Sequence, residues 1–230
     1  MHIFDRSKNF FGGNAIVAGG IPLAVGFGLG LKMQGSKAIS VCFFGEGAIA
    51  EGEFHESMNL AELWQVPVLF VCENNFYAMG TALDRSEAQT DLLLKARSYG
   101  VRSLRCDGMN VQAVHRAAAA AVEFVRSESQ PVFLECQTYR FRAHSMFDPE
   151  LYRSSAEVAE WKKKDPIQLL QSEMLALGQI SRAEIDALQD AADEVVRRAV
   201  EFAEKGHLEP LADLGRFVIS DAEGAGLCLN

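Results

Sequence analysis

AISVCFFGEGA, at residues 38–48, is an apolar run that ends abruptly in glycine and glutamate, and VPVLFVCENN, at residues 66–75, repeats the pattern with a polar ending. Short apolar runs of this kind are typical of strands buried in a parallel sheet. Between them, residues 51–64 carry apolar side chains at helical spacing. The pattern predicts a β-α-β unit whose two loops open at the carboxyl edge of the sheet, where open α/β sheets bind ligands.

The two loops carry groups that suit a metal ion and a phosphate. Glu46 supplies a carboxylate and Asn75 an amide oxygen, which are the hard ligands that Mg²⁺ or Ca²⁺ prefers. Gly45 and Gly47 let the backbone approach a ligand closely. A helix opening near Ala50 would point free N–H groups at the same place, which suits a phosphate. Spacing alone therefore predicts a metal-diphosphate site.

The same motif carries a family resemblance. Gly45-Glu46-Gly47, then 26 residues (48–73), then Asn74-Asn75 resembles the thiamin-diphosphate signature, which is Gly-Asp-Gly followed at a similar distance by Asn-Asn. Essentially the whole chain resembles the α subunit of the E1 component of 2-oxo-acid dehydrogenase complexes, particularly the pyruvate and acetoin branch. Further matching segments are residues 51–52, 59–61, 63–64, 73–75, 77–81 and 140–146.

The resemblance implies a metal site and a cofactor site. Mg²⁺ would be held by Glu46, Asn75 and the backbone carbonyl of Tyr77. Glu46 stands where the family has aspartate, so it is one methylene longer and the ligand geometry must shift. The positions implied to bind thiamin diphosphate are Ala15, Val17, Gly45, Gly47, Ala48, Asn75, Ala78 and His144.

One histidine is implied to act in catalysis. Residues 139–165 interrupt the strand-helix alternation with a basic, aromatic segment that contains Arg140, Arg142 and His144. The matching histidine of the family approaches the cofactor phosphate and the active-site channel. We therefore expect His144 to steer substrate or intermediate, as a hydrogen-bond donor or in acid–base work.

Composition limits the classes of protein that fit. The chain has 230 residues, 49% of them hydrophobic, and a net charge of −9, which argues against a nucleic-acid surface. No apolar run is long enough for a membrane span, and no signal peptide is visible at the N-terminus. The five cysteines include no C-x-x-C pair, which favours buried thiols in a reduced cytoplasmic setting.

The remaining sequence extends the same architecture. Residues 101–106 and 131–138 predict two further strands, so the expected fold is α/β, with a doubly wound and mainly parallel sheet flanked by helices. Residues 76–90 read as a polar loop. We expect residues 1–230 to form a single thiamin-diphosphate-binding domain, with a helical C-terminal part from about residue 154 packed on it.

Helix signals dominate that C-terminal part. Ser154 with Glu157, and Ser181 with Glu184, are spaced as capping boxes. Apolar residues that predict a packing stripe on the second of these helices are Ile185, Leu188, Ala192, Val195, Ala199 and Phe202. The glycine-rich helix expected at residues 21–33 offers a surface for close packing in an assembly.

The resemblance also implies an activity and partners. It predicts oxidative decarboxylation of a small 2-oxo acid, pyruvate, with acyl transfer to a lipoyl group on an E2 acyltransferase. The glutamate that activates the thiamin pyrimidine is expected on an E1 β subunit, so the isolated chain should be inactive and the assembly α₂β₂. Family members carry a further N-terminal region that has no counterpart here.

Other functions fit parts of the sequence. The α subunit of an acetoin dehydrogenase shares the matching segments. Gly45-x-Gly47-x-x-Ala50 also fits a dinucleotide fingerprint, but Glu73 follows later than the usual spacing of about 20 residues and Asn74-Asn75 would have no role. A non-catalytic pseudo-subunit that keeps the fold is a third alternative, motivated by Glu46 in place of aspartate.

Overall fold

The computed structural model describes residues 2–13 and 15–216, and Cys228 lies outside them. Its strands are β1 (Ser40–Gly45), β2 (Val68–Asn74), β3 (Tyr77–Ala78), β4 (Thr81–Ala82), β5 (Arg102–Asp107) and β6 (Val132–Gln137). Its α-helices are α1 (Gly20–Met33), α2 (Gly52–Leu63), α3 (Leu83–Ser86), α4 (Leu92–Arg97), α5 (Val111–Glu128), α6 (Ser155–Lys162), α7 (Pro166–Ala176) and α8 (Arg182–Glu204). Short 3₁₀ helices lie at Arg6–Lys8, Glu46–Ala50 and Leu211–Asp213.

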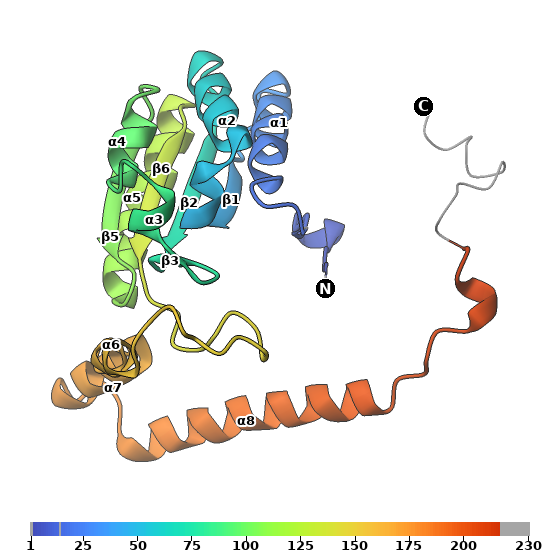
Figure 1. Cartoon of the computed structure of the whole chain (residues 1–230), viewed down its shortest axis with the longest axis vertical. Helices are drawn as coiled ribbons and strands as arrows, with labels where there is room; N and C mark the ends of the chain where they lie inside the picture. Colours follow the sequence, from blue (N-terminus) through green and yellow to red (C-terminus); the bar gives the residue numbers. More distant parts are fainter. Residues whose placement is uncertain (1, 14, 217–230) are drawn as a thin grey trace. The chain divides into compact units, whose positions relative to one another are not determined.

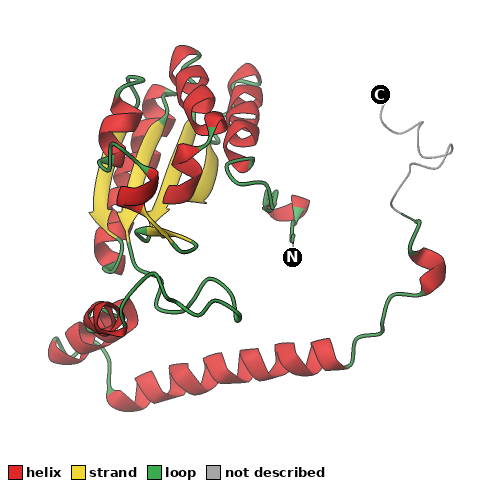
Figure 2. Cartoon of the chain, in the orientation of Figure 1, coloured by secondary structure: helices red, strands yellow, loops and turns green. Residues whose placement is uncertain are grey.

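Four strands form one parallel sheet in the order β1-β2-β6-β5, flanked by helices (Figures 1 and 2). This confirms the predicted α/β fold with its doubly wound parallel sheet. The register pairs Gly45 with Glu73, and Gln137 with both Asn74 and Asp107. The carboxyl ends of all four strands therefore meet at one edge, at which the β3–β4 hairpin follows β2.

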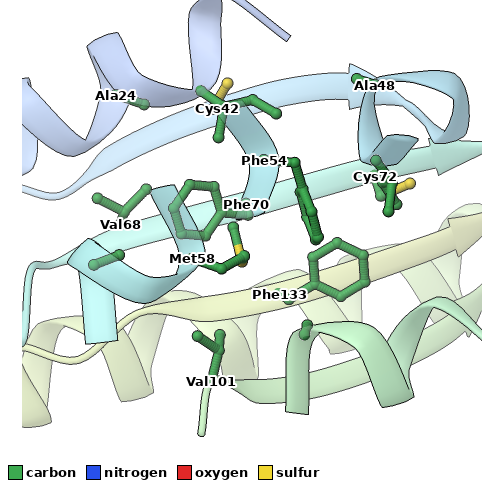
Figure 3. Packing of buried hydrophobic residues seen from close by; sticks show 14 of the residues in the cluster. Ala24, Cys42, Ala48, Phe54, Met58, Val68, Phe70, Cys72, Val101 and Phe133 are labelled. Carbon is green, nitrogen blue, oxygen red and sulfur yellow. The ribbon is translucent and has the colours of Figure 1, made fainter. Parts of the chain in front are cut away.

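Alternating side chains divide the core between the two faces of the sheet. Phe70 and Phe133 pack with α1, α2 and α4 on one face, where the rings of Phe54 and Phe133 meet edge to face at 6.2 Å (Figure 3). Leu69 and Leu134 pack with α5 on the other face. Each fully buried large apolar side chain contributes about 1.5–3 kcal/mol, so these two clusters hold the strand ends in fixed register.

Side-chain caps explain where several helices begin. Asn110 Oδ1 accepts the Ala113 N–H at 2.9 Å at the start of α5. Ser181 and Glu184 form the predicted reciprocal capping box on α8. Ser154 caps α6 in one direction only, because the carboxylate of Glu157 accepts tyrosine hydroxyls instead.

Two local predictions were incomplete. Residues 76–90 are not a plain loop, because they contain the β3–β4 hairpin and α3. The chain after β1 also does not enter an α-helix directly: Glu46–Ala50 is a 3₁₀ helix, and α2 begins only at Gly52. Both elements lie at the carboxyl edge of the sheet, where they fix the positions of the predicted ligands.

The chain divides into two compact units, Met1–Glu173 and Met174–Asn230. In the second unit, Ile185 is buried but Leu188, Val195 and Phe202 are exposed, so the predicted stripe is only partly covered by described residues. The single domain of residues 1–230 with a helical part packed on it stays a prediction. None of the described helices has the length and apolar character needed to cross a membrane.

Candidate functional site

Glu46 and Asn75 come together where β1 and β2 end. Glu46 opens the 3₁₀ helix after β1, is only 2% exposed, and its Oε2 accepts the Asn75 backbone N–H at 3.0 Å. Glu46 Oε1 and Asn75 Oδ1 are both buried without a hydrogen-bond partner among the described residues. Buried polar atoms are nearly always paired, so two unpartnered oxygens from adjacent loops are free to accept a ligand.

Burial and local donors act in opposite directions on Glu46. Burial raises the pKa of its carboxyl above the ordinary value. Hydrogen bonds from backbone N–H groups, first that of Asn75, and the positive charge of Arg140 oppose this rise without cancelling it. A cation at the two free oxygens would favour the ionised form that coordination needs.

Asn74 shapes the bend that presents Asn75. Its Oδ1 accepts the Phe76 N–H at 3.1 Å, and its Nδ2 donates to Glu135 Oε1 at 2.8 Å. Phe76 and Met79 have positive φ angles of 68° and 52°, so the chain turns sharply on either side of Tyr77-Ala78. The motif reasoning missed Glu135; a glutamate in the middle of an apolar strand was the available signal.

The two predicted glycines differ in what surrounds them. A Cβ at Gly47 would lie 2.6 Å from the Cβ of Ala78, so glycine allows the 3₁₀ helix to touch the hairpin. A Cβ at Gly45 would meet nothing within 4 Å, so the backbone there borders open space. Ala48 is buried and Ala78 half-buried. The structure thus brings together four predicted cofactor-binding positions around Glu46, which are Gly45, Gly47, Ala48 and Ala78.

Tyr77 is held through its side chain. Its hydroxyl donates to Glu157 at 3.0 Å, and the Tyr139 hydroxyl donates to the same carboxylate at 2.9 Å. Burial and the Glu157 hydrogen bond raise the pKa of Tyr139 to about 12.

A cavity of about 480 Å³ opens beside the hairpin, with Phe76 and Trp161 among its lining residues. A metal-binding role of the Tyr77 carbonyl stays a prediction.

The basic segment reaches the hairpin through Arg140, whose guanidinium donates to the Met79 carbonyl at 2.6 Å. His144 is exposed, and its backbone N–H donates to Asp148 at 3.2 Å. The Glu150 backbone N–H and other donors hold the pKa of Asp148 below its usual range. Among the described residues no group is recorded in contact with the His144 ring, so the structure does not bring it onto Glu46.

The N-terminal positions are also apart from the Glu46 cluster. Ala15 is exposed and Val17 is 59% exposed, in the segment that precedes α1. The structure therefore leaves their predicted contact with the aminopyrimidine as an expectation. Among the described residues, no side-chain contact joins Ala15 or Val17 to Glu46.

The donor set fits a hard divalent cation. No group of three or more His, Cys, Asp or Glu side chains that would hold a metal exists among the described residues. The set at this edge is instead one carboxylate and one amide oxygen, to which backbone carbonyls and ligand oxygens would be added. Mg²⁺ uses few protein carboxylates and completes its octahedron with water and phosphate oxygens, so the set suits a metal-diphosphate.

Comparisons with known proteins give a family. The model of the family described as "Dehydrogenase E1 component" matches residues 1–211. A Rickettsia felis protein named "Pyruvate dehydrogenase E1 component subunit alpha" is 38% identical over 215 residues, which cover 94% of this chain and 65% of that protein. Proteins of the same name from Zymomonas mobilis and Porphyra purpurea are 41% and 37% identical, over 90% and 96% of this chain. The chain spans 59% to 66% of the length of these three relatives.

Proposed function

Because this chain belongs to the dehydrogenase E1 component family, we propose that it acts as the α subunit of a thiamin-diphosphate-dependent E1 enzyme. The reaction is the oxidative decarboxylation of pyruvate, with transfer of the acetyl unit to a lipoyl group. Relatives named as pyruvate dehydrogenase α subunits favour pyruvate over acetoin. No comparison favours a pseudo-subunit or a nicotinamide enzyme.

The observation that carries this proposal is the pair of orphaned oxygens on Glu46 and Asn75. Mg²⁺ bound by these oxygens and by the Tyr77 carbonyl would also bind the cofactor diphosphate. The metal would offset the charge of Glu46, so that its buried carboxylate stays ionised at neutral pH. Glu46 replaces the usual aspartate, yet its Oε1 is free to coordinate while Oε2 keeps the Asn75 N–H.

The neighbouring residues bind and orient the cofactor. Gly45 leaves open space beside the backbone, where a diphosphate would lie along Gly47 and Ala48. Ala78, in contact with Gly47, would border the same group. The backbone of Ala15 and Val17, two exposed residues, would meet the aminopyrimidine. When bound, thiamin diphosphate supplies the electron sink for decarboxylation.

His144 would act on the reacting substrate. It is exposed on a segment that Arg140 ties to the hairpin, so it is free to meet a substrate that enters the site. Its imidazole would donate a hydrogen bond to the substrate or move a proton in the reaction.

The proposed assembly contains other proteins. An E1 β subunit would supply the acid that activates the pyrimidine, in an α₂β₂ tetramer, and a lipoyl-bearing E2 would accept the acyl group. The net charge of −9 and the described helices favour neither nucleic acid nor membrane as partners. We place this activity in the cytoplasm.

The test is an assay with thiamin diphosphate, Mg²⁺, pyruvate and an artificial electron acceptor, with and without an E1 β subunit. We expect steady turnover only when both subunits are present, and faster turnover with pyruvate than with acetoin or branched 2-oxo acids. Steady turnover by the isolated chain would contradict the division of labour. Faster turnover with acetoin would contradict the substrate.

A further inference from the structure

We propose that Glu135 is a positioning residue for the metal-binding loop, holding residues 75–79 in place through the amide of Asn74. The inference rests on the proposed function in one respect, which is that Glu46 and Asn75 bind a metal. It concerns a carboxylate that neither binds the metal nor touches the substrate in the proposed reaction.

The strand order places Glu135 where it reaches both neighbouring strands. It lies in β6, an inner strand of the sheet, opposite Cys72 of β2 and opposite Arg105 of β5. Asn74 is two residues beyond Cys72, so its side chain is on the same face of the sheet as Glu135. Glu135 is 0% exposed, and a fully buried carboxylate within an apolar strand needs partners for both oxygens.

One oxygen of Glu135 fixes the orientation of the Asn74 amide. Glu135 Oε1 accepts Asn74 Nδ2 at 2.8 Å. An ionised carboxylate only accepts hydrogen bonds, so the NH₂ group of Asn74 must face it and the amide oxygen must face the other way. That oxygen accepts the Phe76 N–H at 3.1 Å. Glu135 thus determines which way the amide turns toward the loop.

The loop needs this support because its backbone is in a sparsely populated region. Phe76 has a φ of 68°, which is unfavourable for a bulky side chain and persists only where the surroundings enforce it. The bend lets the adjacent Asn75 N–H reach Glu46 at 3.0 Å. Glu135 therefore acts on the metal ligands through Asn74 and the Phe76 N–H.

The second carboxylate oxygen of Glu135 binds a positively charged partner. Glu135 Oε2 accepts Arg105 Nε at 2.8 Å, and another nitrogen of that guanidinium donates to Asp91 at 2.7 Å. Asp91 also caps α4 by accepting the Leu93 N–H at 3.2 Å. The Arg105 guanidinium supplies the positive partner that a buried carboxylate needs, so both oxygens of Glu135 accept hydrogen bonds.

Glu135→Gln tests the inference with almost no change of volume. A glutamine has one amide oxygen, so it accepts from Asn74 or from Arg105 and faces the other with a donor. In the metal-free chain, we expect hydrogen exchange of amides 75–79 to become about tenfold faster, as for the loss of one hydrogen bond. In the α–β assembly, the Mg²⁺ concentration for half-maximal thiamin diphosphate binding should rise about 10- to 100-fold.

Glu87→Gln is the matched control. Glu87 is a buried glutamate, 8% exposed, that pairs with Lys95 and makes no recorded contact with Asn74 or Glu46. The Glu87→Gln substitution should lower thermal stability without changing hydrogen exchange of amides 75–79 or the Mg²⁺ concentration that cofactor binding requires. Adding Asn74→Ala to Glu135→Gln should accelerate hydrogen exchange little further, because both substitutions disrupt the same contacts, from Glu135 through the Asn74 amide to the Phe76 N–H.

Unchanged exchange at 75–79 in Glu135→Gln would overturn the inference, and so would an equal change in Glu87→Gln. Failure of the proposed metal site has a separate signature. If Glu46→Gln and Asn75→Ala both bind Mg²⁺ and cofactor as the wild type does, the proposed metal site is wrong. The exchange measurement on metal-free protein then still decides the role of Glu135, since it involves neither metal nor cofactor.

Discussion

Glu46 and Asn75 share one hydrogen bond and leave one buried oxygen each without a partner. The Asn75 N–H donates to Glu46 Oε2 at 3.0 Å, while Glu46 Oε1 and Asn75 Oδ1 find no partner among the described residues. A fold stable without ligand gains nothing from such an arrangement, because an unsatisfied buried group costs about 1–3 kcal/mol. The cation that we propose at this place would supply the missing partner of both oxygens.

Glu46→Gln should stabilise the metal-free chain at neutral pH. Burial raises the pKa of Glu46 in the folded state, so the stability that this residue contributes is complete below its unfolded value and falls as pH rises through the folded value. Glutamine does not ionise and avoids that loss. Urea unfolding in the presence of chelator should show that the unfolding free energy of the variant, relative to that of the wild type, is larger at pH 8 than at pH 4.5. An equal difference at both pH values would disprove this.

Gly47→Ala should cost about 1–3 kcal/mol of unfolding free energy, because the new Cβ would lie 2.6 Å from that of Ala78. Ala78→Gly in the same chain should restore most of the loss. Gly45→Ala is the companion variant: its Cβ meets nothing within 4 Å, so stability should persist while cofactor affinity falls. Thermal unfolding and calorimetric titration measure both. Failure of Ala78→Gly to rescue would show that the contact is not the cause.

Tyr139→Phe should remove a pH-dependent part of the stability. The folded-state pKa of Tyr139 is about 12, above the ordinary value of 10.0, because of burial and its hydrogen bond to Glu157. Its contribution is therefore present below pH 10 and is lost as pH rises toward 12. Unfolding at pH 9 should show a deficit of about 1 kcal/mol in the variant that shrinks at pH 11. A deficit that is constant with pH would contradict the assigned hydrogen bond.

His144→Ala should depress turnover more than cofactor binding. The ring is exposed and makes no hydrogen bond, ion pair or ring contact with the described residues, so its loss should leave folding intact. If it moves a proton in the reaction, kcat and kcat/KM should fall together by about 10²–10⁴. His115→Ala, which removes an exposed histidine of α5, is the control. Wild-type kinetics in His144→Ala would make His144 an ordinary surface residue.

Local sequence patterns predicted the elements that build the site. Apolar runs with polar endings located β1 and β2, and sequential strands in an α/β unit end at the same edge, so Glu46 and Asn75 were expected near each other. The structure places them within one hydrogen bond. The elements were predictable because each depends on hydrophobic periodicity within a short window.

Contacts between distant segments were not predictable in the same way. Glu135 meets Asn74 only because β6 inserts between β2 and β5, an order that no local pattern specifies. Glu157 matches a capping box, yet its carboxylate accepts the Tyr77 and Tyr139 hydroxyls because the fold brings both to α6. Both carboxylates bind groups that are distant in the sequence, and for Glu157 these replace the local capping partner.

Titration of thiamin diphosphate into the chain assembled with an E1 β subunit, with Mg²⁺ or with a chelator, tests the metal-diphosphate site most directly. The wild type should bind tightly only with Mg²⁺. Glu46→Gln and Asn75→Ala should each weaken that binding at least about tenfold, the loss of the charged ligand having the larger effect. Equal affinity in chelator, or unchanged affinity in both variants, would contradict the assignment of Glu46 and Asn75 as metal ligands.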